Sequence, residues 1–176
     1  MANLLDDVKL SIQLEENGYT FYKETADKVA NPLAKATLMS LAQRELVHME
    51  RIKELYAKLT NQGTLKDNWL NDAAVTPSKG ELIAPIIEKL RTSLGKKFEV
   101  SSDITEAYKI AEGLEADSYH LYDKIAQEGV DEITTKFYSA LATEEREHYT
   151  ILDETLQYLN NPGDWFKNQE KWIVEG

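Results

Sequence analysis

One pattern of glutamate and histidine occurs twice in this chain, and the two copies lie 100 residues apart. The first copy is Glu15 followed by Glu-x-x-His at 45–48, and the second is Glu115 followed by Glu-x-x-His at 145–148. The surrounding residues repeat at the same offset: Leu14/Leu114, Tyr19/Tyr119, Tyr22/Tyr122, Leu41/Leu141, Ala42/Ala142 and Glu54/Glu154. A single carboxylate on one helix and Glu-x-x-His on the next, present twice, is the ligand arrangement of a two-metal site in a four-helix bundle.

The composition favours long helices in an all-α fold. Only 8 glycines and 4 prolines occur among 176 residues, and residue types that favour helices dominate. This length is enough for a single domain with its own core, here taken as 1–176. The predicted helices span four segments: 3–29, 33–60, 104–128 and 132–159.

The connections between these helices differ in length. Asn31-Pro32 breaks the chain after the first helix, and Gly129 with Asp131 marks the turn after the third. The long segment 61–102 is predicted to cross the bundle and to contain a short helix near 81–94. The aromatic tail at 164–176 is predicted to be a short arm that packs on the bundle or on a second subunit.

The spacing within each pair of helices brings the repeated residues to one height. In an antiparallel hairpin, two residues lie level when the turn is midway between them. The midpoint of Glu15 and Glu45 is residue 30, and that of Glu15 and His48 lies at the break 31–32. The second pair of helices passes the same test, with its midpoint at residue 130. Each hairpin therefore offers two glutamates and a histidine at one level, roughly 23 Å from its turn at about 1.5 Å per residue.

The residue types indicate which metal such a site prefers. Carboxylates are hard ligands that can bridge two cations, and a site rich in oxygen with few imidazoles suits iron or manganese, with zinc as a substitute. Four buried carboxylates without a cation would repel one another, so their burial itself favours metal. The residue types therefore predict a site for two metal ions, iron or manganese, with zinc as a substitute. The predicted ligands are Glu15, Glu45, His48, Glu115, Glu145 and His148.

At these motifs the chain resembles the rubrerythrin-like branch of the ferritin-like superfamily. The segment from Glu15 to Tyr22 is similar to that family's first-helix signature, and the segment from Leu41 to His48 is similar to its second. Both signatures recur 100 residues later. The resemblance implies a ferritin-like four-helix bundle with a long crossover between the second and third helices, and the same six ligands.

Rubrerythrins also carry an extra glutamate one turn away on the third helix, which exchanges with a histidine as the iron changes oxidation state. Glu112 and Glu115 form such a Glu-x-x-Glu pair. The repeat makes Glu115 the partner of Glu15 and leaves Glu112 as the extra, catalytic acid and seventh ligand. The reverse assignment of Glu112 and Glu115 stays open.

Several neighbouring side chains have more than one interpretation. Five tyrosines on the ligand faces can bond the carboxylates, donate electrons or simply pack in the core: Tyr19, Tyr22, Tyr119, Tyr122 and Tyr138. His120 points off the ligand face and is predicted not to bind metal. Four further glutamates are predicted to be solvated: Glu16, Glu50, Glu144 and Glu147. Glu144 and Glu147 lie close enough to the site to contact its ligands instead.

The resemblance implies an oxidoreductase of oxidative stress that reduces hydrogen peroxide or oxygen. Full-length rubrerythrins carry a rubredoxin domain, whereas this sequence contains no cysteine, so an external, rubredoxin-like electron donor is expected. The alternative is a protein that binds and oxidises iron for storage or delivery without peroxidase turnover. A third interpretation is a bundle that metal merely stabilises, used as an interaction module.

Charge and hydropathy exclude several partners. The net charge is −11 and no basic stripe is present, which argues against nucleic acid. No apolar run reaches about 18 residues, so no membrane span is predicted. The first residues lack the features of a secretory signal, and the absence of cysteine fits a cytoplasmic location. A homodimer is the expected assembly.

Overall fold

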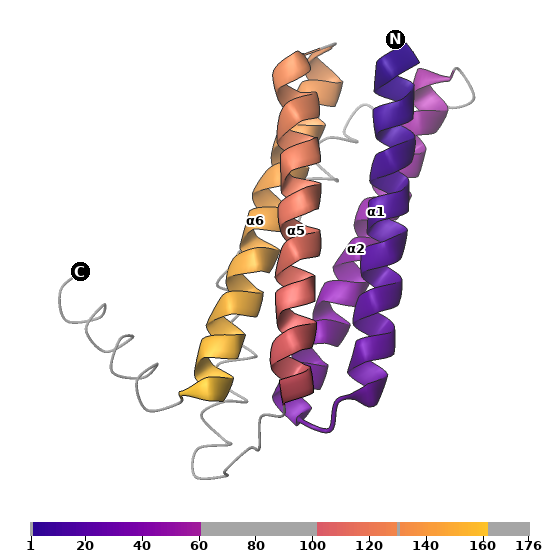
Figure 1. Cartoon of the computed structure of the whole chain (residues 1–176). Coiled ribbons are helices and arrows are strands. Elements are labelled where there is room, and N and C mark those ends of the chain that lie inside the picture. Colours follow the sequence, from indigo (N-terminus) through magenta and orange to yellow (C-terminus); the bar gives the residue numbers. More distant parts are fainter. Residues whose placement is uncertain (1, 61–101, 130, 162–176) are drawn as a thin grey trace, which may run out of the picture.

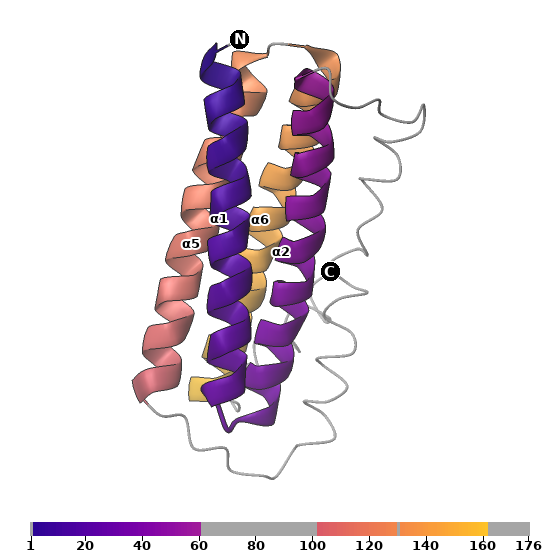
Figure 2. The ribbon, with the colours of Figure 1, turned by 90° about the vertical axis from the view of Figure 1, so that its right-hand side faces the viewer.

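The computed structural model describes residues 2–60, 102–129 and 131–161. These residues form four α-helices: α1 (Ala2–Lys28), α2 (Pro32–Leu59), α5 (Ser102–Glu128) and α6 (Glu132–Asn160). Figures 1 and 2 show the four helices running side by side along one long axis. The predicted all-α four-helix bundle is confirmed, and each observed helix begins and ends within two residues of its predicted bounds.

The ends of the helices follow from local chemistry. Asn31 caps α2 by accepting hydrogen bonds from two backbone N–H groups of its first turn, at 3.0 and 3.1 Å, and Pro32 begins that helix. Asp131 caps α6 by accepting from the backbone N–H of Thr134 at 2.9 Å. Gly129 follows α5 with φ +54°, a conformation that glycine adopts without strain. Both short turns therefore lie where the sequence predicts them.

The bundle consists of two hairpins that face each other. α1 packs along α2 and α5 packs along α6, while α1 also meets α5 and α2 meets α6. Two apolar clusters, each with residues of all four helices, fill the two ends of the bundle. Tyr22, Leu38 and Leu152 belong to one cluster, and Ile52 and Ile125 belong to the other. The repeated Glu and His residues lie between these clusters, so apolar packing closes the centre of the bundle at both ends.

The outer faces of the helices carry charged residues. Pairs one turn apart include Lys28 with Glu24, at 3.8 Å, and Lys136 with Glu132, at 2.6 Å. Such exposed pairs each add little to stability. Among the four described helices, none is long and apolar enough to cross a membrane.

Three predicted features lie outside the described residues. They are the crossover predicted at 61–102, apart from its last residue, which begins α5, the short helix near 81–94 and the C-terminal arm at 164–176. The centre of the bundle does not depend on them, because all of its predicted ligands belong to the four described helices.

Candidate metal centre

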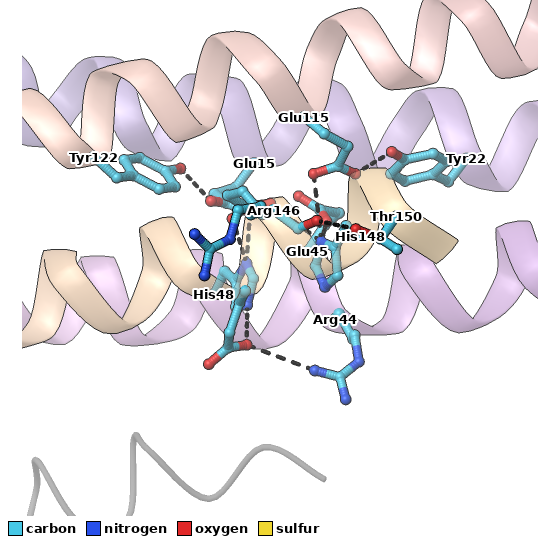
Figure 3. Close-up of polar contacts among 12 residues, drawn as sticks. Glu15, Tyr22, Arg44, Glu45, His48, Glu115, Tyr122, Arg146, His148 and Thr150 are labelled. Carbon is cyan, nitrogen blue, oxygen red and sulfur yellow. Dashed lines mark hydrogen bonds and ion pairs between the residues drawn. The ribbon is translucent and has the colours of Figure 1, made fainter. Parts of the chain in front are cut away.

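The six side chains predicted to bind metal come together in the middle of the bundle. Each of them exposes 3% or less of its surface. Figure 3 shows side chains of this cluster converging from different helices. Each helix contributes to the set: Glu15 from α1, Glu45 and His48 from α2, Glu115 from α5, and Glu145 and His148 from α6.

The six residues form two overlapping groups of four. One group contains Glu15 and His48 and the other contains Glu115 and His148, while Glu45 and Glu145 belong to both. Within each group the candidate ligand atoms all lie within 4.8 Å of one another. Two cations at these positions would therefore share two carboxylates, and each would have one histidine and one glutamate of its own.

The two histidines present the same ring nitrogen to the carboxylates. Nδ1 of His48 lies 3.3 Å from Oε2 of Glu15 and 3.1 Å from Oε1 of Glu145. Nδ1 of His148 lies 3.4 Å from Oε2 of Glu115 and 3.2 Å from Oε1 of Glu45. The two rings stack, with centroids 5.4 Å apart and planes 12° apart. The histidines are thus related by the same pseudo-twofold symmetry as the sequence repeat.

Each unshared glutamate also accepts a hydrogen bond from a tyrosine of the other hairpin. The hydroxyl of Tyr22 donates to Oε1 of Glu115, and the hydroxyl of Tyr122 donates to Oε1 of Glu15 (Figure 3). Burial raises the pKa of both phenols well above the usual value, and the nearby carboxylates raise it further. Both phenols therefore stay protonated and act as donors. The interpretation of Tyr22 and Tyr122 as hydrogen-bond partners of the ligand carboxylates is confirmed.

Several buried atoms of the cluster have no hydrogen-bond partner within the described part of the chain. Four of them are Oε2 of Glu15, Oε1 of Glu45, Oε1 of Glu145 and Nδ1 of His48, and the fifth is Nε2 of His148. Leaving such polar atoms unpaired in a water-free interior costs free energy, and cations beside the first four would satisfy them. These atoms belong to the donor types that iron and manganese prefer. The residues therefore fit a two-metal centre.

The pKa values of the carboxylates reflect how closely they are packed. Burial raises the pKa of Glu45 and of Glu115 well above the usual value, and neighbouring carboxylates add to the shift. Burial alone would also raise the pKa of Glu145, but His48 and His148 outweigh it and hold that pKa well below the usual value. Without metal, a negative charge is therefore more favourable on Glu145 than on Glu45 or Glu115.

The pKa values of the two histidines are shifted by the same packing. Burial would lower the pKa of both rings, but the carboxylates around them raise it well above the usual value, chiefly Glu15 for His48 and Glu115 for His148. Without metal the cluster thus carries protons on its imidazoles and on some of its carboxylates. Because a metal takes the place of those protons, metal binding releases them, and its affinity rises with pH.

A buried ion pair lies on the outer side of the cluster. Oε2 of Glu144 lies 2.8 Å from Nε2 of His48 and 3.6 Å from a guanidinium nitrogen of Arg44. Glu144 is buried, so its predicted solvation is wrong and the alternative, contact with a ligand, is confirmed. Arg44 is a residue of the site that was not predicted. The sign that pointed to it is that positions 44 and 144 are repeat equivalents with opposite charges.

The remaining side chains follow the simpler interpretations. Tyr138 is buried and donates to Ser11 at 3.2 Å rather than to a carboxylate. Tyr19 and Tyr119 are partly buried and pack against the two apolar clusters. Of the residues predicted to lie off the site, His120, Glu16 and Glu50 are exposed, while Glu147 is half-buried.

Glu112 lies outside all three groups of candidate metal ligands in the described residues. It is half-buried on α5, and its pKa is raised by burial and then by Asp153. Its service as a seventh ligand stays a prediction, whereas the six other side chains meet in the described structure.

Comparison with known proteins agrees with this geometry. The family model that matches the chain is that of rubrerythrin, over residues 6–156. This span covers most of the bundle and includes all six residues of the cluster. Neither a search of curated proteins nor a search of solved structures gave a significant match. The match extends over most of the chain and includes both copies of the repeat, so the chain belongs to the rubrerythrin family.

Proposed function

We propose that this protein is a di-iron oxidoreductase that reduces hydrogen peroxide with electrons from an external donor. The observation that carries the proposal is the sharing of Glu45 and Glu145 by two groups of four buried ligands. A single structural ion would need only one of these two ligand groups. Membership of the rubrerythrin family supports the same conclusion.

The charge of the cluster suits two divalent ions. Four carboxylates supply four negative charges, which match two ions of charge +2, while the imidazoles bind as neutral ligands. Glu15 and His48 would hold one ion, Glu115 and His148 would hold the other, and Glu45 and Glu145 would be available to both. Manganese or zinc would fit the same atoms.

The reaction needs two electrons and two protons for each peroxide, which becomes two waters. When bound as two Fe(II) ions, the metals supply the two electrons. The side chains exclude bulk water through the apolar clusters at both ends and keep the terminal carboxylates in place through Tyr22 and Tyr122. The electrons are restored by a separate one-electron carrier such as a rubredoxin-like protein, because the sequence has no cysteine to hold its own iron–sulfur site.

Glu112 is proposed as the acid that carries protons toward the centre. It is half-buried, and burial together with Asp153 raises its pKa, so it holds a proton at higher pH than an exposed glutamate does. The repeat places Ile12 at the equivalent position, so this acid occurs on one side of the centre only.

The first test is metal content after anaerobic loading with Fe(II). Two ions per chain are expected in the wild type and in Glu16→Ala, an exposed control next to a proposed ligand. Glu45→Ala is expected to lose both ions because it removes a shared ligand. One ion or none in well-folded wild-type protein would rule out the two-metal centre.

The second test is stopped-flow oxidation of the Fe(II)-loaded protein by peroxide and by oxygen. Peroxide is expected to react much faster, and Glu112→Ala is expected to slow that step while keeping two ions bound. Wild-type kinetics in Glu112→Ala would remove its proposed role. A faster reaction with oxygen than with peroxide would favour the alternative function, the binding and oxidation of iron without peroxidase turnover.

A further inference from the structure

One pair of repeat-related residues beside the metal centre combines opposite charges. Position 44 is arginine in the first half, and its equivalent, position 144, is glutamate in the second. Their side chains meet across the bundle, with a guanidinium nitrogen of Arg44 3.6 Å from Oε2 of Glu144. Both are buried, with 8% and 7% of their surfaces exposed, so water screens this pair only weakly.

The same Glu144 oxygen contacts one of the two cluster histidines. It lies 2.8 Å from Nε2 of His48, whereas Nδ1 of that ring faces the carboxylates of the cluster. A ring that binds metal through Nδ1 carries its proton on Nε2 and donates it. Glu144 therefore accepts a hydrogen bond from His48, while Arg44 steadies the accepting carboxylate.

The other histidine has no such acceptor. Nε2 of His148 is buried and has no hydrogen-bond partner in the described residues. The repeat equivalent of Glu144 is Arg44, and a guanidinium cannot accept a hydrogen bond. Glu144 approaches a ring nitrogen of His148 only within the 4.8 Å limit that defines their group.

The contacts around the two ion positions otherwise correspond closely. At each position an unshared glutamate accepts a hydrogen bond from a tyrosine, and Nδ1 of a histidine faces the carboxylates. Both positions share Glu45 and Glu145. Two differences are present: Nδ1 of His148 also lies 3.1 Å from Oε2 of Glu145 on its own helix, and only His48 has a carboxylate acceptor at its outer nitrogen. A carboxylate bonded to a metal-bound imidazole fixes its orientation and makes it a stronger ligand, and its loss typically lowers metal affinity about 10–100-fold.

We infer that the two ion positions are inequivalent, and that the position of Glu15 and His48 binds a divalent cation more tightly than the position of Glu115 and His148. Glu144, steadied by Arg44, is the positioning residue that creates the difference. This inference rests on the proposed two-metal centre, because it concerns the relative affinity of its two positions.

The test is a Zn(II) titration of the metal-free protein labelled with ¹⁵N-histidine, followed by NMR at one fixed pH. The chain has 3 histidines, and His120→Asn identifies the one outside the cluster. His48→Gln and His148→Gln then distinguish the remaining two signals. In the wild type, the Nδ1 signal of His48 is expected to shift with the first equivalent of zinc and that of His148 with the second, for affinities that differ about 10–100-fold.

The variant Glu144→Gln keeps the size of the side chain but removes the charged acceptor. Two equivalents of zinc should still bind, but both histidine signals should now shift together. Glu147→Gln is the matched control, because it removes one carboxylate from the same helix at a half-buried position next to the ligand His148. It should preserve the order of loading seen in the wild type.

Simultaneous shifts in the wild type, earlier loading at His148, or an unchanged order in Glu144→Gln would each overturn the inference. The order of loading is measured on the wild type itself. The inference can therefore be contradicted even if a variant folds poorly. Fewer than two bound equivalents in the wild type would instead overturn the proposed two-metal centre, and the inference with it. The count of bound ions and their order therefore separate the two claims.

Discussion

The phenol of Tyr22 on α1 donates a hydrogen bond to the carboxylate of Glu115 on α5, so one hairpin positions a proposed ligand of the other. Tyr122 repeats this relation in the opposite direction by donating to Glu15. In each case the phenol binds one carboxylate oxygen, and the second oxygen faces the Nδ1 atom of a histidine. The two tyrosines thus join the hairpins and leave one oxygen of each unshared carboxylate for a metal.

Tyr22→Phe tests this arrangement. Loss of the phenol leaves a buried carboxylate without its donor, so the metal-free protein should lose about 1–3 kcal/mol of unfolding free energy. Metal affinity should fall about 10–100-fold because Glu115 is no longer oriented. Urea unfolding and metal titration measure the two effects. Tyr138→Phe is the control, because its hydroxyl donates to Ser11, and it should keep its metal affinity. An equal loss of affinity in both variants would contradict the orienting role.

Glu45→Gln and Glu145→Gln should change the stability of the metal-free protein in opposite directions at pH 7. The pKa of Glu45 is raised, so its charge is unfavourable in the folded state and its removal should stabilise the protein. The pKa of Glu145 is lowered because His48 and His148 outweigh burial, so removal of this charge should destabilise it. Thermal unfolding with a chelator measures both. Shifts of the same sign would show that the two shared carboxylates are electrostatically alike. Both variants should lose metal.

The metal-free protein should become less stable as the pH rises from 5 to 8. The raised pKa values of Glu45 and Glu115 give stability that is fully present below their usual value of 4.5 and is lost as the pH rises through the folded values. The raised pKa values of His48 and His148 act in the same direction above 6.5. Glu145 contributes the opposite slope only at lower pH, because its pKa is depressed. Melting temperatures across this range, with and without bound metal, provide the measurement.

Metal should flatten this dependence on pH, because bound cations keep the carboxylates ionised and the imidazoles neutral. The melting temperature of the loaded protein should therefore exceed that of the metal-free protein by more at pH 8 than at pH 5. Parallel curves for the two forms would indicate that the cluster does not exchange protons for metal.

Gly18→Ala should weaken metal binding without unfolding the bundle. A Cβ atom at this position would lie 3.1 Å from Oε2 of Glu45, so that shared carboxylate must move by a few tenths of an ångström. Gly113→Ala is the matched control on α5, because nothing lies within 4 Å of the added atom. The control should gain about 1 kcal/mol of unfolding free energy from helix propensity, with unchanged affinity. Metal titration of both variants measures the effect. Equal affinities would mean that Glu45 can move aside without weakening metal binding.

Much of the candidate centre was predictable because its determinants are local. The turn at Asn31, the cap at Asp131 and the periodicity of the helices each depend on neighbours within one or two turns. Once the turns are known, helix geometry places residues such as Glu15 and Glu45 at the same height. Turn position and helix geometry do not decide whether the side chain of Glu112 contacts the centre. In the described structure Glu112 lies outside the groups of candidate ligands.

The sequence by itself determined the four described helices, the two hairpins and the level at which six glutamate and histidine side chains meet, because periodicity and turn position act within each hairpin. Only the tertiary structure decided that Tyr22 reaches Glu115 and that Glu144, rather than Glu147, contacts His48. These contacts join residues about 100 positions apart in the sequence. They depend on how far each helix turns about its axis and how the hairpins pack, which the pattern of a single helix does not specify.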